Sequence, residues 1–293
     1  MHTAEGFIRH IDSCSIYDSS LFVPFHVDSR QVGWVLRSLV PVLRGHSAFV
    51  DMGESLSLIP VGANDEAARS KAIAEAALLL AEHEQTPLDG EIYPILTTWG
   101  EAPLARIDRR AIPWFGTRGF GVHVNGYVRR PDGLYLWIGQ RAPDRKVDPN
   151  KLDTMIGGGL PYGQTIRSNL EKEAWEEAGF SPMAVTGAQH VSTLNYKVEM
   201  MGGLRNDTLF VFDMELPDGK IPRSTDGEVA SFKLWPAHEV AHIIHETDHF
   251  KFNCNLVLID FLLRHNLIGL EAAEAKRVHH AMAPLLSDEG KEG

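Results

Sequence analysis

Three consecutive glycines, Gly157 to Gly159, precede a segment that ends in closely spaced glutamates. Glu173, Glu176 and Glu177 stand at i, i+3 and i+4, a spacing that places all three carboxylates on one face of a helix. Three like charges on one face repel each other, and a hard divalent cation such as Mg²⁺ compensates them because it takes oxygen ligands. Glycines ahead of such a helix let the backbone bend and approach a ligand closely. The pattern therefore predicts a metal site for a phosphorylated substrate.

Local signals predict a helix between Thr165 and Gly179. Thr165 can cap its N-terminus, and Gly179 stands where a glycine ends a helix. Between them, apolar residues recur every four positions, at Ile166, Leu170, Ala174 and Ala178. The carboxylates lie at the edge of this stripe, where a site between a helix and a sheet would lie. For the glutamates alone, a solvated acidic face paired with lysines is the alternative, and the preceding glycines favour the metal site.

This stretch resembles the Nudix box, in which a glycine is followed after five residues by Glu, and after seven more by Arg-Glu-apolar-x-Glu-Glu-x-Gly-apolar. Gly158 takes the first position, and KEAWEEAGF at 172–180 takes the last nine. Two positions depart from the family pattern, because Gln164 replaces the first Glu and Lys172 replaces the Arg. Those two side chains pair in the family, so the resemblance implies a polar link between Gln164 and Lys172.

The resemblance implies a fold of the α/β class, a Nudix α/β/α sandwich with a mixed sheet, over residues 116–240. An N-terminal α+β module over 1–115 would serve substrate recognition or dimerisation, and a C-terminal helical extension over 241–293 would pack on the Nudix domain. The residues agree with this division: residues 65–84 form an amphipathic helical pattern, and two strands joined by a turn at 131–133 begin at Phe120. We also expect a turn at 201–203 and a frayed end from Ser287.

Beyond the box, the chain is similar to the thiamine-pyrophosphokinase-associated subgroup of Nudix proteins. The similarity rests on GVHVNGY at 121–127, KLD at 151–153, NCN at 253–255 and DFLLRH at 260–265. It implies hydrolysis of thiamine diphosphate, or of oxidised analogues such as oxo- and oxythiamine diphosphate, to the monophosphate and phosphate. ADP-ribose or nucleoside-diphosphate sugars are the alternative substrates. A non-catalytic diphosphate-binding protein is the alternative of another class.

The resemblance also implies roles for individual residues. Glu173, Glu176 and Glu177 would hold Mg²⁺ or Mn²⁺, with the carbonyl of Gly158 as a further ligand. The metal would polarise a phosphoryl oxygen and help to generate hydroxide from bound water. Either Glu176 or Glu228 would take the proton of that water, and the sequence does not choose between them.

The expected substrate contacts come from outside the acidic run. A basic cluster at 141–151 precedes the box, and Arg141 and Lys151 are the predicted ligands of the diphosphate. A solubilising loop is the equally weighted alternative for this cluster. Asn125 and the N-terminal module are predicted to contact the organic group, and Gln164 is included among the substrate-binding residues. Asp226 stands behind Glu228 as a second acidic candidate.

A competing motif lies further along the chain. HETDH at 245–249 fits the H-E-x-x-H pattern, in which two histidines on one helix face bind zinc and the glutamate acts as base. Such a short pattern arises readily in a chain with 14 histidines. We therefore expect His245 and His249 to be surface or interface residues.

Composition argues against nucleic-acid-binding, disulfide-rich and membrane-spanning proteins. A formal net charge of −11 argues against nucleic acid as a partner, which leaves a small-molecule diphosphate. Two cysteines far apart form no disulfide framework, and no apolar run approaches the ~20 residues that a membrane span needs. No uninterrupted apolar stretch marks the N-terminal residues, so we expect a cytoplasmic protein without membrane attachment. The apolar C-terminal helices are compatible with a homodimer.

Overall fold

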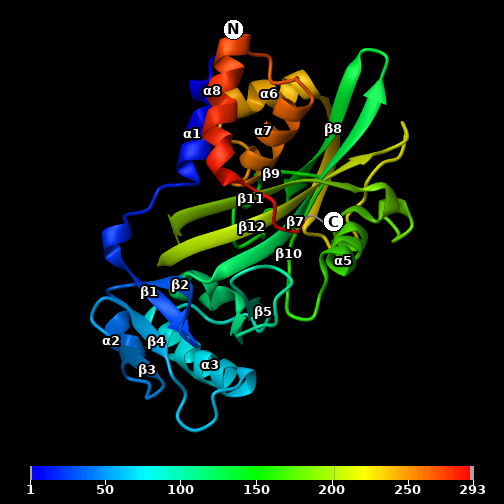
Figure 1. Cartoon of the computed structure of the whole chain (residues 1–293). Coiled ribbons are helices and arrows are strands. Elements are labelled where there is room, and N and C mark those ends of the chain that lie inside the picture. The colour runs from blue at the N-terminus through cyan, green and yellow to red at the C-terminus, as the bar shows by residue number, and fades with distance from the viewer. Residues whose placement is uncertain (1, 201, 291–293) are drawn as a thin grey trace.

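The computed structural model describes residues 2–200 and 202–290 (Figure 1). Met201 of the predicted turn and the last three residues of the predicted frayed end lie outside them. Helices gather at one end of the molecule in Figure 1, and a small sheet with α3 lies at the other end. In the described residues no helix is long and apolar enough to cross a membrane.

A mixed sheet forms the centre of the molecule. Its strands are β7 (Arg118–Arg130), β8 (Gly133–Arg141), β9 (Leu152–Asp153), β10 (Ile156–Gly159), β11 (Gln189–Met200), β12 (Gly203–Glu215), β13 (Val229–Pro236) and β14 (Leu286–Ser287). The main path runs β13-β8-β7-β12-β11-β14, with β10 paired to β7 and β9 paired to β8. β7 and β12 are parallel, whereas the other neighbours are antiparallel. The predicted mixed sheet is therefore confirmed.

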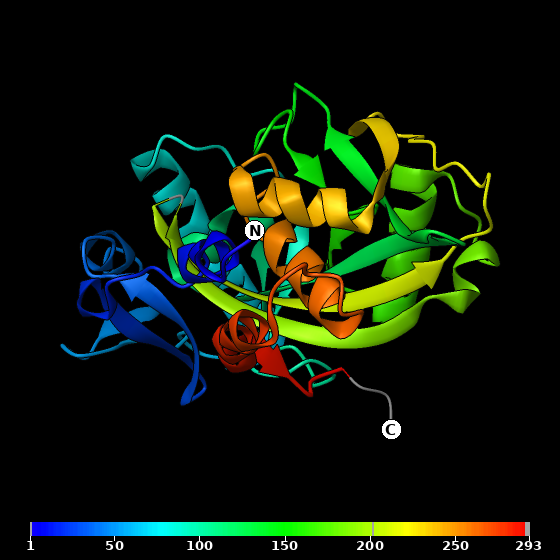
Figure 2. The same ribbon diagram turned by 90° about the horizontal axis from the view of Figure 1, so that it is seen from above.

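Helices cover both faces of this sheet because alternate residues of each strand point to opposite faces. On one face, Val122 and Phe210 pack in a core with Leu170 of α5 (Ile166–Ala178). On the other face, Leu209 and Val211 pack with the C-terminal helices α6 (Ala237–Glu246), α7 (Cys254–Arg264) and α8 (Ala272–Met282). Figure 2 shows α6 and α7 lying across the sheet. This arrangement is the expected α/β/α sandwich.

The N-terminal module has its own core. Its four-stranded sheet has the order β2-β1-β4-β3. The elements are β1 (Phe22–Val27), β2 (Arg30–Leu36), α2 (Val40–Leu43), β3 (Phe49–Asp51), β4 (Leu56–Leu58), α3 (Glu66–His83), the paired strands β5 (Ile92–Ile95) and β6 (Ala105–Asp108), and α4 (Ile112–Phe115). The predicted helix at 65–84 is confirmed as α3, with the Asp65 carboxylate accepting from Ala68 N–H as its N-cap. The β6 strand was not predicted.

The first helix, α1 (Glu5–Ser13), lies apart from this module. Phe7 and Ile11 belong to the same core cluster as α6, α7 and α8, and Figure 1 shows α1 beside α8. An amphipathic helix buries its apolar face against any complementary surface, and sequence position does not specify which. Residues 5–13, which the prediction assigns to the N-terminal module, therefore pack with the C-terminal helices.

Candidate active site

The box helix α5 begins and ends as predicted. The Thr165 side chain accepts a hydrogen bond from Ser168 N–H, and the Ser168 hydroxyl bonds back to the Thr165 backbone, which makes a capping box. Gly179 follows the helix in the left-handed conformation, φ 67°. This short loop and cap carry the chain from β10 into α5 and set the glutamates against the glycine strand.

The glycines of β10 lie directly against functional side chains. An ideal Cβ on Gly158 would stand 2.1 Å from Cδ of Glu173, and one on Gly157 would stand 2.9 Å from Cε1 of His123. Neighbouring residues of a strand face opposite sides, so the two glycines present opposite faces of β10 to these two side chains. Any larger residue at either position would displace its neighbour.

The three box carboxylates differ in burial. Glu177 is buried and accepts a 2.7 Å hydrogen bond from the backbone N–H of Gly157. Burial raises the pKa of Glu177 well above its usual value, and the charge of Asp153 raises it further. Burial also raises the pKa of Glu173, with the charges of Glu176 and Glu228 adding to the effect and Lys172 opposing it. A bound cation would oppose both shifts, because it stabilises the ionised form of each carboxyl group.

The predicted link between Gln164 and Lys172 is wrong. The Lys172 ammonium lies 2.7 Å from Glu176 Oε2 and 3.2 Å from Glu173 Oε1, while Gln164 Oε1 accepts from the Ser168 hydroxyl at 2.7 Å. The carboxylates of Glu173, the next residue, and of Glu176, one helical turn on, attract the lysine more strongly than the neutral amide of Gln164 does. The lysine therefore supplies the positive charge that the resemblance would assign to a metal.

The carboxylate set fits a divalent metal. All its side-chain donors are oxygens, as Mg²⁺ or Mn²⁺ prefers. Because one ammonium group contacts both Glu173 and Glu176, a single cation can reach both side chains. Glu177, buried with an elevated pKa, would be the third donor, and the backbone of Gly158 lies against Glu173. Together they can bind and orient a metal-bound diphosphate.

The late acidic loop is attached to the end of α5. The backbone N–H of Thr225 donates to the Glu176 carbonyl at 2.8 Å, and Asp226 Oδ1 accepts from Glu228 N–H at 2.8 Å. Glu228 is close enough to the box that its charge raises the pKa of Glu173, and its side chain forms an ion pair with Arg145. The loop therefore brings an acidic and a basic group beside the carboxylate set.

The two predicted diphosphate ligands have other partners. Arg141 is buried, bonds to Asp153 at 3.0 Å, and donates to carbonyl groups of the following loop. The ammonium of Lys151 donates to the carbonyl of Asp248. A diphosphate would have to exchange these contacts, whereas Arg145 of the same basic cluster lies beside Glu228 with its Nε lacking a partner among the described residues.

Asn125 lies under the C-terminal helices. It is 1% exposed, and its amide donates to Asp213 Oδ1 at 3.0 Å. Asp213 in turn accepts from Arg264 of α7 at 2.6 Å and from His265 at 3.2 Å. The predicted contact between Asn125 and an organic group is therefore not supported by its position, which is covered by α7.

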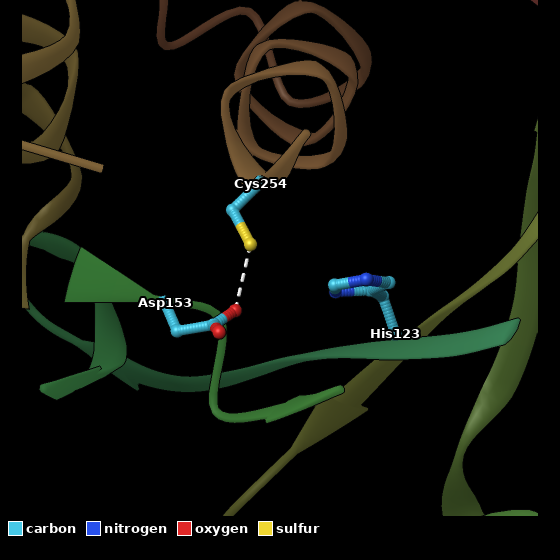
Figure 3. A group of neighbouring side chains, drawn as sticks. All are labelled: His123, Asp153 and Cys254. Atoms are coloured by element: carbon cyan, nitrogen blue, oxygen red, sulfur yellow. Dashed lines mark hydrogen bonds between the residues drawn. The ribbon is translucent and has the colours of Figure 1, made fainter. Parts of the chain in front are cut away.

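A second cluster of possible metal donors lies behind the glycine strand. His123, Asp153 and Cys254 offer donor atoms that all lie within 4.8 Å of one another, and Figure 3 shows the three side chains converging from β7, β9 and α7. The Cys254 thiol lies 2.6 Å from Asp153 Oδ1, and His123 Nδ1 lies 2.8 Å from the Thr154 hydroxyl. Burial raises the pKa of Cys254 well above its usual value, which keeps the thiol protonated as a donor.

This cluster is better described as a hydrogen-bonded network than as a metal centre. Asp153 accepts from the Thr154 N–H and the Cys254 thiol through one oxygen, and its other oxygen lies 3.0 Å from Arg141 and 3.8 Å from Lys251. A cation bound here would compete with two positive side chains. The network instead ties α7 to β9 beside the buried Glu177.

The competing zinc motif does not assemble. α6 ends at Glu246, so His249 lies beyond the helix rather than one turn along it. The His245 imidazole accepts from Thr3 N–H at 2.9 Å through Nε2 and lies 2.6 Å from Glu246 through Nδ1. His245 therefore joins α6 to the N-terminal segment, as expected for an interface histidine.

Two residues near the box escaped the sequence reasoning. Asn169 is fully buried one turn before Glu173, and neither atom of its amide has a partner among the described residues. Its spacing of four from Glu173 is a signal that could have found it.

The second residue is Tyr93 of β5, which lies on Gly159, with its hydroxyl oxygen 1.9 Å from the position of a Cβ. No local pattern connects Tyr93 with the box, 65 residues or more away in the sequence.

Comparison with known proteins identifies the family of both parts of the chain. A family model described as NUDIX domain matches residues 119–256, and one described as Domain of unknown function (DUF4743) matches residues 6–119. Nudix hydrolase 24, chloroplastic, from Arabidopsis thaliana is 36% identical over 273 residues, which cover 91% of this chain and 74% of the relative. Nudix hydrolase 20, chloroplastic, from the same plant is 36% identical over 283 residues, covering 92% and 75%.

A further relative extends the comparison to yeast. An uncharacterised protein of Saccharomyces cerevisiae is 31% identical over 186 residues, covering 58% of this chain and 53% of that protein. The fold and the glutamate helix define a phosphoanhydride hydrolase of the Nudix type. The chain belongs to the Nudix hydrolase family and acts on a diphosphate substrate, and members of this family typically depend on a divalent metal.

Proposed function

We propose that this enzyme hydrolyses thiamine diphosphate, or oxidised analogues of it, to the monophosphate and phosphate. One observation supports this substrate most directly. Three segments that resemble the thiamine-related subgroup are distant in sequence, yet their residues His123, Asp153 and Cys254 meet behind the glycine strand. These segments therefore pack together in a buried network, and Asp153 lies close enough to the box that its charge raises the pKa of Glu177.

In the proposed reaction, Glu173, Glu176 and Glu177 bind the metal, with the carbonyl of Gly158 as a further ligand. When bound, the metal supplies a polarised phosphoryl oxygen and a water of lowered pKa. The water oxygen attacks the terminal phosphorus and the bridging P–O bond breaks, which leaves the monophosphate and inorganic phosphate. Glu176 or Glu228 accepts the proton of the water, since both side chains are partly exposed to solvent.

Cationic groups balance the charge of the diphosphate. Arg145 is the strongest proposal because it lies beside Glu228 and its Nε has no partner among the described residues. Arg141 and Lys151 remain proposals that require their present contacts to exchange. A guanidinium group suits this role because its donors match phosphate oxygens.

A substrate panel tests the proposal. Phosphate release, or nucleoside monophosphate release where appropriate, is measured with Mg²⁺ and with Mn²⁺ on thiamine diphosphate, oxothiamine diphosphate, ADP-ribose and a nucleoside-diphosphate sugar. We expect the thiamine compounds to give the highest kcat/KM. A higher kcat/KM on ADP-ribose or the sugar nucleotide would assign the enzyme to that alternative class. Tight binding of a diphosphate without metal-dependent turnover would instead support the non-catalytic alternative.

A further inference from the structure

We propose that the N-terminal module takes part in catalysis by holding the glycine strand in place, and that Tyr93 is the positioning residue through which it acts. The proposal rests on the proposed metal-dependent hydrolysis at the box. It gives a task to a module whose family model is described only as a domain of unknown function.

Tyr93 connects the core of the module to the glycine strand. It is 4% exposed and packs in the same apolar cluster as Ile95, Ile107 and Trp114. Its hydroxyl oxygen lies where a side chain at Gly159 would begin, 1.9 Å from the Cβ position. The hydroxyl contacts Glu91 only at 3.5 Å, the outer limit of a hydrogen bond, so packing holds the ring in place.

The module also contacts the chain at Tyr162, three residues beyond Gly159. The backbone N–H of Tyr162 donates to the carbonyl of Ile92 at 2.8 Å, and the Arg106 guanidinium lies 4.5 Å from the centre of the Tyr162 ring. β5 and β6 of the module therefore contact this segment at two points, Gly159 and Tyr162, three residues apart. Backbone pairing and ring packing together resist movement of this segment.

The end of the glycine strand that contacts the module lies directly beside the proposed metal site. Gly158, one residue before Gly159, lies against Glu173 on the opposite face of the strand. Burial raises the pKa of Tyr93, and the charge of Glu173 adds to the rise, which agrees with the short path between them. Packed interiors transmit displacement rather than absorb it, so a shift of Gly159 also moves Gly158 relative to Glu173.

Metal binding measured without substrate tests this role. Mn²⁺ affinity is measured by electron paramagnetic resonance, alongside kcat, KM and thermal unfolding, on the full chain. We expect Tyr93→Ala to weaken Mn²⁺ binding about tenfold and to lower kcat by roughly 10- to 100-fold, with KM nearly unchanged. Tyr93→Phe should retain most of both, because the ring supplies the packing. The control is Tyr17→Ala, which removes a 39% exposed tyrosine outside the module core and should change neither quantity.

Several outcomes would overturn the proposal. A folded Tyr93→Ala protein with wild-type Mn²⁺ affinity and kcat excludes a positioning role, and a change confined to KM would make Tyr93 a substrate contact instead. If Tyr93→Ala does not fold, Gly159→Ala replaces it, since the new methyl group presses on the same hydroxyl. Wild-type Mn²⁺ affinity in a folded Gly159→Ala protein would also exclude the positioning role. If the wild-type chain binds Mn²⁺ but hydrolyses no diphosphate, the proposed function fails while the Mn²⁺ comparison still decides the role of Tyr93.

Discussion

The carboxyl group of Glu173 occupies the space that a side chain at Gly158 would need, since a Cβ on the glycine would stand 2.1 Å from the carboxyl carbon of the glutamate. Gly158→Ala should therefore displace Glu173 and reduce kcat by roughly 100-fold, while the fold is retained because the rest of β10 still pairs with β7. Steady-state kinetics and circular dichroism measure the two effects. Gly187→Ala is the matched control, since no atom lies within 4 Å of the new methyl group. Equal activity in both variants would contradict the packing argument.

Removing one box carboxylate should abolish most turnover without unfolding the protein. Glu176→Gln keeps the shape of the side chain and removes its charge, so we expect a loss in kcat of at least about 10²-fold with little change in the unfolding temperature. Glu171→Gln on the same helix is the control, because Glu171 pairs with Arg167 instead of joining the set. Chelation with EDTA should reduce wild-type activity to the level of Glu176→Gln, and added Mg²⁺ should restore it. Near-wild-type turnover in Glu176→Gln would refute the assignment of the site.

Activity should depend on pH through Glu177. Burial raises the pKa of this carboxyl well above 4.5, and only its ionised form binds a metal. At low Mg²⁺, activity should therefore fall as pH decreases through the raised pKa. High Mg²⁺ favours the ionised form and should shift this acidic limb to lower pH. The measurement is kcat/KM against pH at limiting and saturating Mg²⁺, and an acidic limb that stays in place would be evidence against Glu177 as a ligand.

Lys172 competes with the metal for Glu173 and Glu176. Lys172→Met removes this ammonium, so the affinity for a metal should rise by about fivefold, the effect of removing roughly 1 kcal/mol of repulsion between like charges. Without metal the two carboxylates lose their counter-charge, and the unfolding temperature in EDTA should fall. Isothermal titration and thermal unfolding test both. Arg167→Met, which breaks a comparable pair with Glu171, should leave metal affinity unchanged; weaker binding in Lys172→Met would mean that the lysine orients the site.

His123 should make the folded state less stable in acid. Burial lowers its pKa from 6.5 to about 4. Below pH 6.5 the unfolded chain binds a proton on this histidine, whereas the folded chain binds it only as the pH approaches about 4. The contribution of His123 to the free energy of unfolding is therefore complete above pH 6.5 and is lost as the pH falls towards about 4. The difference is roughly 3 kcal/mol in the free energy of unfolding. Urea unfolding across this range should show a shallower pH dependence in His123→Gln than in the wild type, and identical slopes would exclude a buried neutral histidine.

Much of the site was readable because its signals are local. The cap at Thr165, the end at Gly179 and the glutamate face of α5 all follow from residues within one helix, and the structure has each of them. The pairing of Lys172 was misjudged for a physical reason. A family pattern records which residues pair, but the replaced charges changed the local energetics, so the lysine moved to Glu173 and Glu176.

Residues whose partners are distant could not be judged in this way. Arg141 and Asn125 carry groups that suit a ligand, yet each is bonded to a carboxylate from another strand, Asp153 and Asp213 respectively. Arg145 stood in the same basic cluster as Arg141, and nothing in that short stretch ranked one above the other. Their relative burial depends on how the loop before the box folds back, which is a long-range matter.

The sequence by itself determined the Nudix box, the shared helix face of its three glutamates and the mixed α/β class, because helix periodicity, capping and strand alternation act over a few residues. Only the tertiary structure decided that Tyr93 of the N-terminal module lies on Gly159, that α1 packs with the C-terminal helices, and that Asp153 meets Cys254. These contacts join segments from about 65 to more than 200 residues apart. Their formation depends on the fit of complete packed surfaces, which no short stretch of sequence encodes.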